Sequence, residues 1–423
     1  MASKVLHRIP SFLRHVGPGV VTGAADDDPS GIATYTQAGA QFGTGVLWTV
    51  FLSLPFMVAI QLVSARIGRQ SGQGIAANLR QHTPRAFLIT IVVLLTVANT
   101  INIAADLAAM GEALQLVVGG GEHFHTVVFG VLTVLLQVFV PYRRLAPILK
   151  WLTLSLFVYV AAAFTVEIPW RQVMHDLVVP HIEASSAFAM MIVAVLGTTI
   201  SPYLFFWQAS QEVEEMRLRG IQAGQESEAT VKRALRRVRL DTLVGMVFSN
   251  GIAFFVMLTA AVVLHGAGIH DVQTAAQAAQ ALRPLAGDLA FELFAMGIIA
   301  TGLLAVPVLA SSSAYAVAEA LGWPEGLERH WREAKEFYAL IAVGTLIGTA
   351  LDFTSIDPMK ALYWSAVING VVAVPIMVAM MWLAGNPAVM GALTVRRKTR
   401  FLGWGAVLVM LAAVLMMGWD LAR

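Results

Sequence analysis

The sequence predicts an all-α integral membrane protein. Of its 423 residues, 57% are hydrophobic and only 13% are charged, a balance far from that of soluble globular proteins. Eleven apolar segments are candidates to cross a bilayer as helices, which takes about 20 mostly apolar residues. The formal charge of +2 gives no indication of a nucleic-acid partner. The absence of cysteine excludes disulfides, thiolate metal sites and cysteine nucleophiles.

The predicted spans follow one another with short connections. Those longer than about 25 residues are expected to tilt or to extend past the lipid. The basic N-terminus is not followed by a cleavage-site pattern, so the first span is expected to stay as an anchor. Residues 271–282 are expected to form a surface helix or turn. In order, the eleven spans are residues 17–41, 46–68, 86–117, 124–141, 147–166, 187–211, 241–265, 285–319, 337–352, 359–385 and 401–421.

The distribution of Lys and Arg predicts the orientation, because these residues favour cytoplasmic loops. With the N-terminus inside and eleven crossings, all but four of the 28 Lys and Arg residues fall on the cytoplasmic side. The four exceptions are Arg171, Arg283, Lys360 and Arg423. We therefore expect a cytoplasmic N-terminus, an outside C-terminus and a place in a bacterial inner membrane.

Two of the apolar segments contain residues that a lipid-facing helix should avoid. The first span holds Asp26-Asp27-Asp28-Pro29-Ser30-Gly31 near its middle, and the sixth holds Ser201-Pro202. Proline lacks an amide hydrogen and glycine is permissive in its backbone angles, so both places are predicted to be unwound. The expected helix breaks are Pro29, Ser30, Gly31 and Pro202.

The two breaks lie five spans apart, as in transporters built from two inverted repeats. The sequence therefore predicts a LeuT-like 5+5 inverted repeat in a single transporter domain. Repeat one would cover about 17–166, repeat two about 187–385, and an extra helix about 401–421. At each break, unpaired carbonyl oxygens favour a cation, and a nearby carboxylate would complete the site.

Acidic side chains inside the membrane are the candidate functional groups. A charged carboxylate there costs about 3 kcal/mol by insertion scales, so it persists mainly when paired, hydrated or functional. Successive helical residues point about 100° apart, so three adjacent aspartates cannot all face one ion. We expect Asp28 to coordinate the ion directly, and Asp26 and Asp27 to line an aqueous route. Asp106 would serve ion or proton passage, or be a structural carboxylate bonded to Asn99, Thr100 or Asn102.

One structural alternative is a helix cap at the membrane surface. Aspartate before proline is a common helix start, so residues 26–30 would then lie at the aqueous boundary, with the true span starting near Pro29. The second break argues against this, because Ser201-Pro202 cannot be a surface cap without halving the sixth span.

Several motifs resemble the opening of the Nramp divalent-metal transporters. The resemblance implies an inverted-repeat importer of manganese, iron or related divalent cations, usually with protons. The residues that carry it are Gly17-Pro18-Gly19, Asp28-Pro29, Ala33-Thr34, Gln37-Ala38-Gly39-Ala40-Gln41, Ser64-Ala65-Arg66-Ile67-Gly68, Ala105-Asp106-Leu107-Ala108 and the proline break of the sixth span.

This chain departs from the family pattern at the positions that bind the metal and determine its selectivity. Gly31 replaces an asparagine ligand, and Ser201-Pro202-Tyr203 replaces Met-Pro-His. A second family histidine falls on Gln208, an acid on Ala109, and a glutamine near Ala366. The resemblance then implies an all-oxygen site, with Tyr203 and Gln208 along the ion pathway. Its ligands would be Asp28, the carbonyls of Ala25 and Thr198, and Ser201.

An all-oxygen site suits magnesium, calcium or manganese, whereas thioether and imidazole favour later transition metals. The pattern is most similar to the Nramp-related magnesium transporters. We expect an alternating-access transporter of Mg²⁺ and/or Mn²⁺, a non-enzyme without a cofactor, whose partners are the cation and the bilayer. Proton coupling is not expected, because the ten histidines lie in loops or at span ends.

Other functions remain open at this point. The first alternative is a proton-coupled Mn²⁺ or Fe²⁺ importer, and the second is a transporter of an organic solute or a sodium-coupled amino acid. Three consecutive acids at the break argue against an anionic substrate group, which leaves an organic cation such as an amine. An intramembrane protease using Asp28 and Asp106 is disfavoured, because no flanking sequence supports such a dyad. A membrane sensor is disfavoured because the chain has no sizeable soluble domain.

Overall fold

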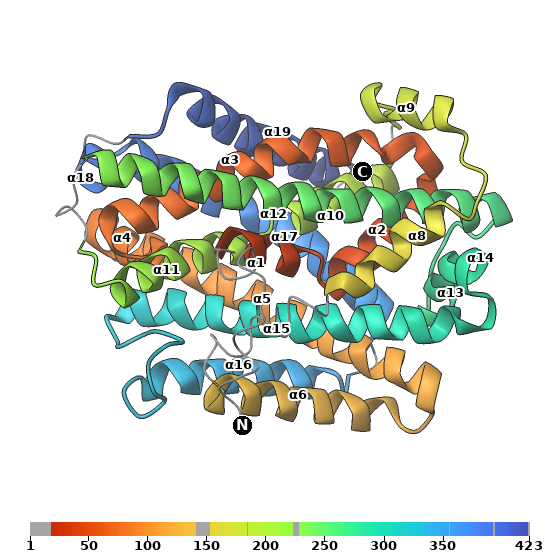
Figure 1. Ribbon diagram of the computed structural model, residues 1–423, viewed down its shortest axis with the longest axis horizontal. Helices are drawn as coiled ribbons and strands as arrows, with labels where there is room; N and C mark the ends of the chain where they lie inside the picture. Colours follow the sequence, from red (N-terminus) through yellow and green to blue (C-terminus); the bar gives the residue numbers. More distant parts are fainter. Residues whose placement is uncertain are drawn as a thin grey trace, which may run out of the picture.

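The computed structural model describes residues 18–140, 153–183, 185–222, 228–354, 356–391 and 394–421, and every regular element in these ranges is a helix (Figure 1). Gly17 and the other residues before Pro18 lie outside the described ranges, as do residues 147–152 of the predicted fifth span. The all-α prediction is therefore confirmed for the described part of the chain.

Seven helical stretches among the described residues are long and apolar enough to cross a membrane. They correspond to the second, third, sixth, seventh, eighth, tenth and eleventh predicted spans. The helices concerned are α3 (Trp48–Ser71), α5 (Arg85–Val118), α10 (Ser186–Thr199) with α11 (Pro202–Leu218), α12 (Glu228–Val263), α15 (Ala290–Leu321), α17 (Pro358–Gly385) and α19 (Arg397–Leu421).

The remaining four predicted spans are shorter or interrupted. The first is divided into α1 (Pro18–Asp26) and α2 (Pro29–Phe42), and the fourth is α6 (Glu122–Phe139). The described part of the fifth is η5 (Thr153–Leu156) with α8 (Phe157–Ala163), and the ninth is α16 (Lys335–Leu351). These elements fit the predicted order, although length and hydropathy alone do not establish all eleven crossings.

Short helices connect the long ones. The segment predicted to be a surface helix or turn contains α13 (Ala275–Ala279) and η7 (Gln280–Leu282). The other connecting elements are η4 (Gly43–Val46), α4 (Ile75–His82), α9 (Trp170–Val178), η6 (His265–Ala267), α14 (Arg283–Ala286), η8 (Gly287–Leu289) and α18 (Pro387–Met390).

The two halves of the first span lie in the centre of the bundle. In Figure 1, α1 and α2 are surrounded by longer helices, with α6 and α16 along one edge and α19 along the opposite edge. α5 packs against α15, α17, α6 and α16, so it joins the centre to one edge. On α19, Phe401, Leu408 and Leu415 are more than 60% exposed, as expected for a face that meets lipid tails.

Small residues allow α1 to approach α12 closely. A Cβ atom added to Gly23 would lie 2.2 Å from the carbonyl oxygen of Gly245, so the two backbones are in direct contact. Such contacts are typical of helix packing in membranes, where association depends on close van der Waals fit. This packing fixes α1, and with it the first break, against α12.

Candidate cation site

The first break occupies Asp27 and Asp28, between the end of α1 and the start of α2. Asp28 is the N-cap of α2, with extended backbone angles (φ −69°, ψ 170°), and Pro29 is the first residue of the helix. The sequence places the break at residues 29–31, whereas Pro29, Ser30 and Gly31 form the first turn of α2. The difference arises because proline suits the first helical position and the aspartate side chain caps the turn.

Asp28 accepts three hydrogen bonds although it is only 2% exposed. Its Oδ1 accepts from the Gly31 amide at 2.7 Å and from the Ser30 hydroxyl at 2.8 Å. Its Oδ2 accepts from Asn102 Nδ2 at 2.9 Å. The cap geometry of the alternative interpretation is therefore present, but it is buried inside the bundle rather than lying at an aqueous boundary.

The second break has the same construction. α10 ends at Thr199, Ile200 and Ser201 are not helical, and Pro202 is the first residue of α11. The hydroxyl of Ser201 donates to the carbonyl oxygens of Thr198 at 2.7 Å and Gly197 at 3.0 Å. Two groups that the resemblance implies as ligands, Ser201 Oγ and Thr198 O, are thus hydrogen bonded to each other.

The two breaks meet inside the protein. Tyr203 at the start of α11 donates its hydroxyl to the carbonyl oxygen of Ala25 in α1 at 2.8 Å. Gly31 lies beside the other half-helix, because a Cβ added there would be 3.1 Å from Thr198 Oγ1. The four residues that the resemblance implies as ligands are each at most 2% exposed, namely Ala25, Asp28, Thr198 and Ser201. The two breaks that the sequence separates by five spans therefore share one buried region.

Asp26 and Asp27 contact α12, and they share no hydrogen-bond partner with Asp28 among the described residues. The Ser249 hydroxyl is 2.7 Å from Asp26 Oδ2 and 3.2 Å from Asp27 Oδ1. Their other oxygens, Asp26 Oδ1 and Asp27 Oδ2, are buried and have no hydrogen-bond partner among the described residues. Both side chains are fully buried, so their expected place along an aqueous route remains a prediction.

Asp106 is connected to Asp28 through one amide. Asn102 Nδ2, which donates to Asp28, also lies 3.2 Å from Asp106 Oδ2. Of the three partners considered for Asp106, Asn102 is the one that contacts it, since Asn99 donates to α15 and Thr100 to its own helix. Asn102 is therefore both the structural partner expected for Asp106 and the link from Asp106 to the candidate ligand Asp28.

Asn369 of α17 completes this bridge and was not identified from the sequence. Its Nδ2 donates to Asn102 Oδ1 at 3.1 Å. Its own Oδ1 is buried and has no hydrogen-bond partner in the described part of the chain. The available signal was a lone amide inside the apolar tenth span, which is costly unless it has a partner.

Gln208 lies on α11, away from the two breaks. It accepts a hydrogen bond from Thr22 of α1 at 2.5 Å, and its Nε2 is 3.4 Å from Glu212 Oε1. Gln208 therefore connects α1 to the C-terminal half of α11. Its expected contribution to the ion pathway remains a prediction.

Among the ligands that the resemblance implies, Asp28 is the one carboxylate and the others are neutral oxygens. No three His, Asp or Glu side chains in the described ranges come together in a way that could hold a metal ion. The neutral oxygens implied at the two breaks are the Ser201 hydroxyl and the carbonyls of Thr198 and Ala25. Such a set can bind a hard cation through oxygen, with water supplying the remaining ligands.

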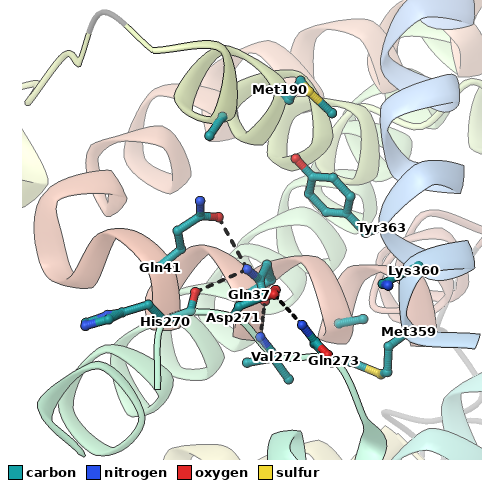
Figure 2. Close-up of a pocket in the computed structure, with 12 residues that line it drawn as sticks. Gln37, Gln41, Met190, His270, Asp271, Val272, Gln273, Met359, Lys360 and Tyr363 are labelled. Atoms are coloured by element: carbon teal, nitrogen blue, oxygen red, sulfur yellow. Dashed lines mark hydrogen bonds between the residues drawn. The ribbon is translucent and has the colours of Figure 1, made fainter. Parts of the chain in front are cut away.

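A cavity of about 510 Å³ lies along α2 on its C-terminal side. Ala33 and Gln37 of α2 line it together with Met190 of α10 and Tyr363 of α17. Figure 2 shows Gln37 at its centre, where its amide oxygen accepts from Val272 N at 2.8 Å. Ala33 follows the first turn of α2, so this cavity approaches the break from that side.

Comparison with known proteins identifies the family. The model of the family described as natural resistance-associated macrophage protein-like (Nramp) matches residues 19–420. The chain belongs to the Nramp family.

Several relatives of this Nramp chain are named divalent metal cation transporter MntH. The protein from Klebsiella pneumoniae subsp. pneumoniae is 28% identical over 405 residues, covering 94% of this chain and 92% of the relative. The protein from Acidiphilium cryptum is 26% identical over 408 residues, covering 93% and 88%. These relatives are named as transporters, in agreement with the expectation that the chain is not an enzyme. Their names do not distinguish the magnesium-transporting branch of the family.

Solved structures support the fold. A mutant of the Eremococcus coleocola manganese transporter has a TM-score of 0.76 at 17% identity and covers 95% of this chain and 85% of its own. Mhp1, a nucleobase-cation-symport-1 family transporter, has a TM-score of 0.58 at 13% identity and covers 95% and 92%. The predicted LeuT-like architecture with two broken helices is thereby confirmed.

Proposed function

We propose that this chain is a divalent metal cation transporter that moves a hard cation, Mn²⁺ or Mg²⁺, by alternating access. The names of its MntH relatives and of the manganese transporter with the same fold support the divalent cation. The observation that carries the proposal is Asp28, a buried carboxylate where two broken helices meet.

The preference for a hard cation rests on the atoms at the breaks. Carboxylate, carbonyl, hydroxyl and amide oxygens are good ligands for Mg²⁺ and Mn²⁺. The proposed ligands, namely Asp28, Ser201 and the carbonyls of Ala25 and Thr198, include neither sulfur nor imidazole. Both carbonyls already accept hydroxyl hydrogens, so they are ordered before the cation arrives. Mg²⁺ keeps several of its waters in most sites, which suits a site with one charged ligand.

We further propose that transport is not coupled to protons. The described histidines nearest to α2, His265 and His270, contact the carbonyl of Ala40 near the C-terminal end of that helix. Among the residues that the structure describes, no histidine side chain contacts Asp28 or its hydrogen-bond partners. A second candidate, proton-coupled manganese import, is favoured by Asp106, which is one amide away from Asp28 and could carry a proton.

The orientation that fits this function has the N-terminus in the cytoplasm of a bacterial cell. The Lys and Arg distribution supports it, because the connections predicted to lie inside hold most of the basic residues. The cavity along α2 would then open to the outside, and the cation would reach Asp28 from there.

Uptake into proteoliposomes tests the proposal. We expect wild-type protein to take up Mn²⁺ and Mg²⁺ without acidifying the lumen. Asp28→Ala should abolish uptake, because it removes the one charged ligand. Asp288→Ala, at an exposed acid in η8, is the matched control and should leave uptake unchanged. Strong Cd²⁺ or Fe²⁺ transport with little Mg²⁺ would contradict the cation preference, and acidification during metal entry would favour the coupled alternative.

A further inference from the structure

We propose that the Asn102 side chain is a ligand of the transported cation, reached by a rotation of its amide that Asn369 accommodates. The inference rests on the proposed function and names a ligand that the resemblance does not supply. It concerns three elements: α2 with Asp28, α5 with Asn102 and Asp106, and α17 with Asn369.

The starting point is a chain of amides that ends on Asp28. Asn369 Nδ2 donates to Asn102 Oδ1 at 3.1 Å, and Asn102 Nδ2 donates to Asp28 Oδ2 at 2.9 Å. Asn102 is fully buried and Asn369 is 1% exposed, so neither amide lies at the protein surface. In this arrangement Asn102 presents its N–H group to the carboxylate that is expected to hold the cation.

That arrangement is unsuitable once a cation is bound. A cation at Asp28 Oδ2 would lie within about 2.0–2.6 Å of that oxygen, on the side that the Asn102 N–H group now occupies. The N–H group carries partial positive charge, so it is repelled. Rotating the terminal amide by half a turn exchanges nitrogen for oxygen at almost no change in shape, and it presents Oδ1 as a hard ligand.

Asn369 makes this rotation possible. After the rotation, Asn102 Nδ2 would point toward Asn369 and would need an acceptor, because a buried unpaired donor is costly. Asn369 Oδ1 is such an acceptor, since it is buried and has no hydrogen-bond partner among the described residues. A matching rotation of Asn369 would turn this oxygen toward Asn102 Nδ2 and place Asn369 Nδ2 where the oxygen now lies.

The rotation of Asn102 also changes the contacts of Asp106. Its Oδ2 loses the Asn102 donor, now 3.2 Å away, as the amide oxygen turns toward it. A divalent cation between Asp28 and Asn102 offsets that loss, because its charge lies close to both carboxylates. The rotated state is therefore stabilised by the cation and is unfavourable without it.

Substitutions of similar size at Asn102 distinguish a cation ligand from a residue that only donates a hydrogen bond. Asn102→Asp keeps an oxygen but removes the N–H donor, whereas Asn102→Leu removes both. If Asn102 is a ligand, Asn102→Leu weakens Mn²⁺ binding by about tenfold or more, while Asn102→Asp retains or tightens it. The measurement is calorimetric titration of the purified full chain with Mn²⁺ and with Mg²⁺, after size-exclusion chromatography has verified folding.

Asn369 provides an independent test that leaves the ligand itself in place. Asn369→Asp offers only acceptors, so it favours the rotated Asn102 and is expected to tighten Mn²⁺ binding. Asn369→Leu removes the acceptor and is expected to weaken it. Opposite effects of these two variants support the rotation, and equal effects overturn it.

The remaining outcomes are also decisive. Equal weakening by Asn102→Asp and Asn102→Leu would show that Asn102 only holds Asp28 as a donor, and unchanged binding in both would show that it has no part in the site. Either result overturns the inference. If Asp28→Ala also binds Mn²⁺ like the wild type, the proposed function fails as well, so the two failures are distinguishable.

Discussion

The hydroxyl of Tyr203 donates to the carbonyl oxygen of Ala25 at 2.8 Å and joins two half-helices that lie 178 residues apart in the chain. Ala25 is near the C-terminal end of α1, where carbonyl groups lack intrahelical donors. The bond therefore satisfies one group at the first break with a side chain from the second. The same carbonyl oxygen is one of the ligands that we propose for the cation.

Removing only this hydroxyl should show separately what the bond contributes to stability and how it affects cation binding. In Tyr203→Phe the Ala25 carbonyl loses its donor, and we expect the free energy of unfolding to fall by about 1 kcal/mol. Mn²⁺ binding should be retained or tightened, because the carbonyl becomes available to the cation. Thermal unfolding with and without Mn²⁺ measures both. Weaker binding in this variant would instead identify the Tyr203 hydroxyl as a ligand.

Gly31 is expected to be sensitive to any added side chain. A Cβ there would lie 3.1 Å from Thr198 Oγ1 and 3.4 Å from Asp28 Oδ1, closer to the threonine than ordinary contact allows. Gly31→Ala should therefore push the breaks apart and reduce Mn²⁺ uptake. Adding Thr198→Ala removes the nearest atom and should restore much of the uptake. A double variant no better than the single one would mean that Thr198 is not the obstacle.

Ser249 is predicted to stabilise the two aspartates that face α12. Its hydroxyl lies within hydrogen-bond distance of both Asp26 and Asp27, each of which has a second oxygen without a partner. Ser249→Ala should lower the free energy of unfolding by about 1–3 kcal/mol, because buried acceptors are left unpaired. Ser249→Thr keeps the hydroxyl and serves as the control. Equal unfolding temperatures in the alanine and threonine variants would contradict this assignment.

The docking of α9 on η4 should depend on pH through Asp176. Burial raises the pKa of this carboxyl, but hydrogen bonds from Thr44, at 2.6 Å, and from His175 and Gln172 outweigh it, so the pKa is lowered. The unfolded segment then binds the proton more tightly than the docked one. The contribution is present above the usual aspartate pKa and is lost as the pH falls through the lowered value.

Hydrogen exchange in α9 and η4 measures this dependence. Wild-type protein should lose protection in this region as the pH falls below about 4, the range of an ordinary aspartate. Asp176→Asn should show weaker protection at neutral pH and little further loss in acid. The same acid-dependent loss in both proteins would show that another group is responsible.

The sequence was sufficient to predict the fold class and which two helices are interrupted, and insufficient to predict the contacts between them. Pro29 and Pro202 identify the two interrupted helices because proline cannot continue a helix without losing a hydrogen bond. The precise break at Asp27 and Asp28 was missed, since the capping bond from Gly31 to Asp28 depends on local side-chain geometry. Fold class followed from composition, because a bilayer permits few ways to satisfy the backbone.

The amide bridge illustrates what could not be predicted. Asn102 was considered only as a partner of Asp106, and its bond to Asp28 requires that α2 and α5 be adjacent. Asn369 lies 267 residues from Asn102, and a single amide in an apolar span has no periodicity that distinguishes it. Ser249 was missed for the same reason. Such contacts depend on tertiary packing, which hydropathy and local motifs do not encode.

The contact between Gly23 and Gly245 restricts how the first half-helix can move. Because the two backbones touch without an intervening side chain, a tilt of α1 about this point would keep the contact, whereas sliding α1 along α12 would break it. The glycine pair would be the fulcrum of such a tilt. The Pro18 end of α1, where Gly19 N is held by Asp241 at 2.7 Å, would then sweep the widest arc and give up that anchor first.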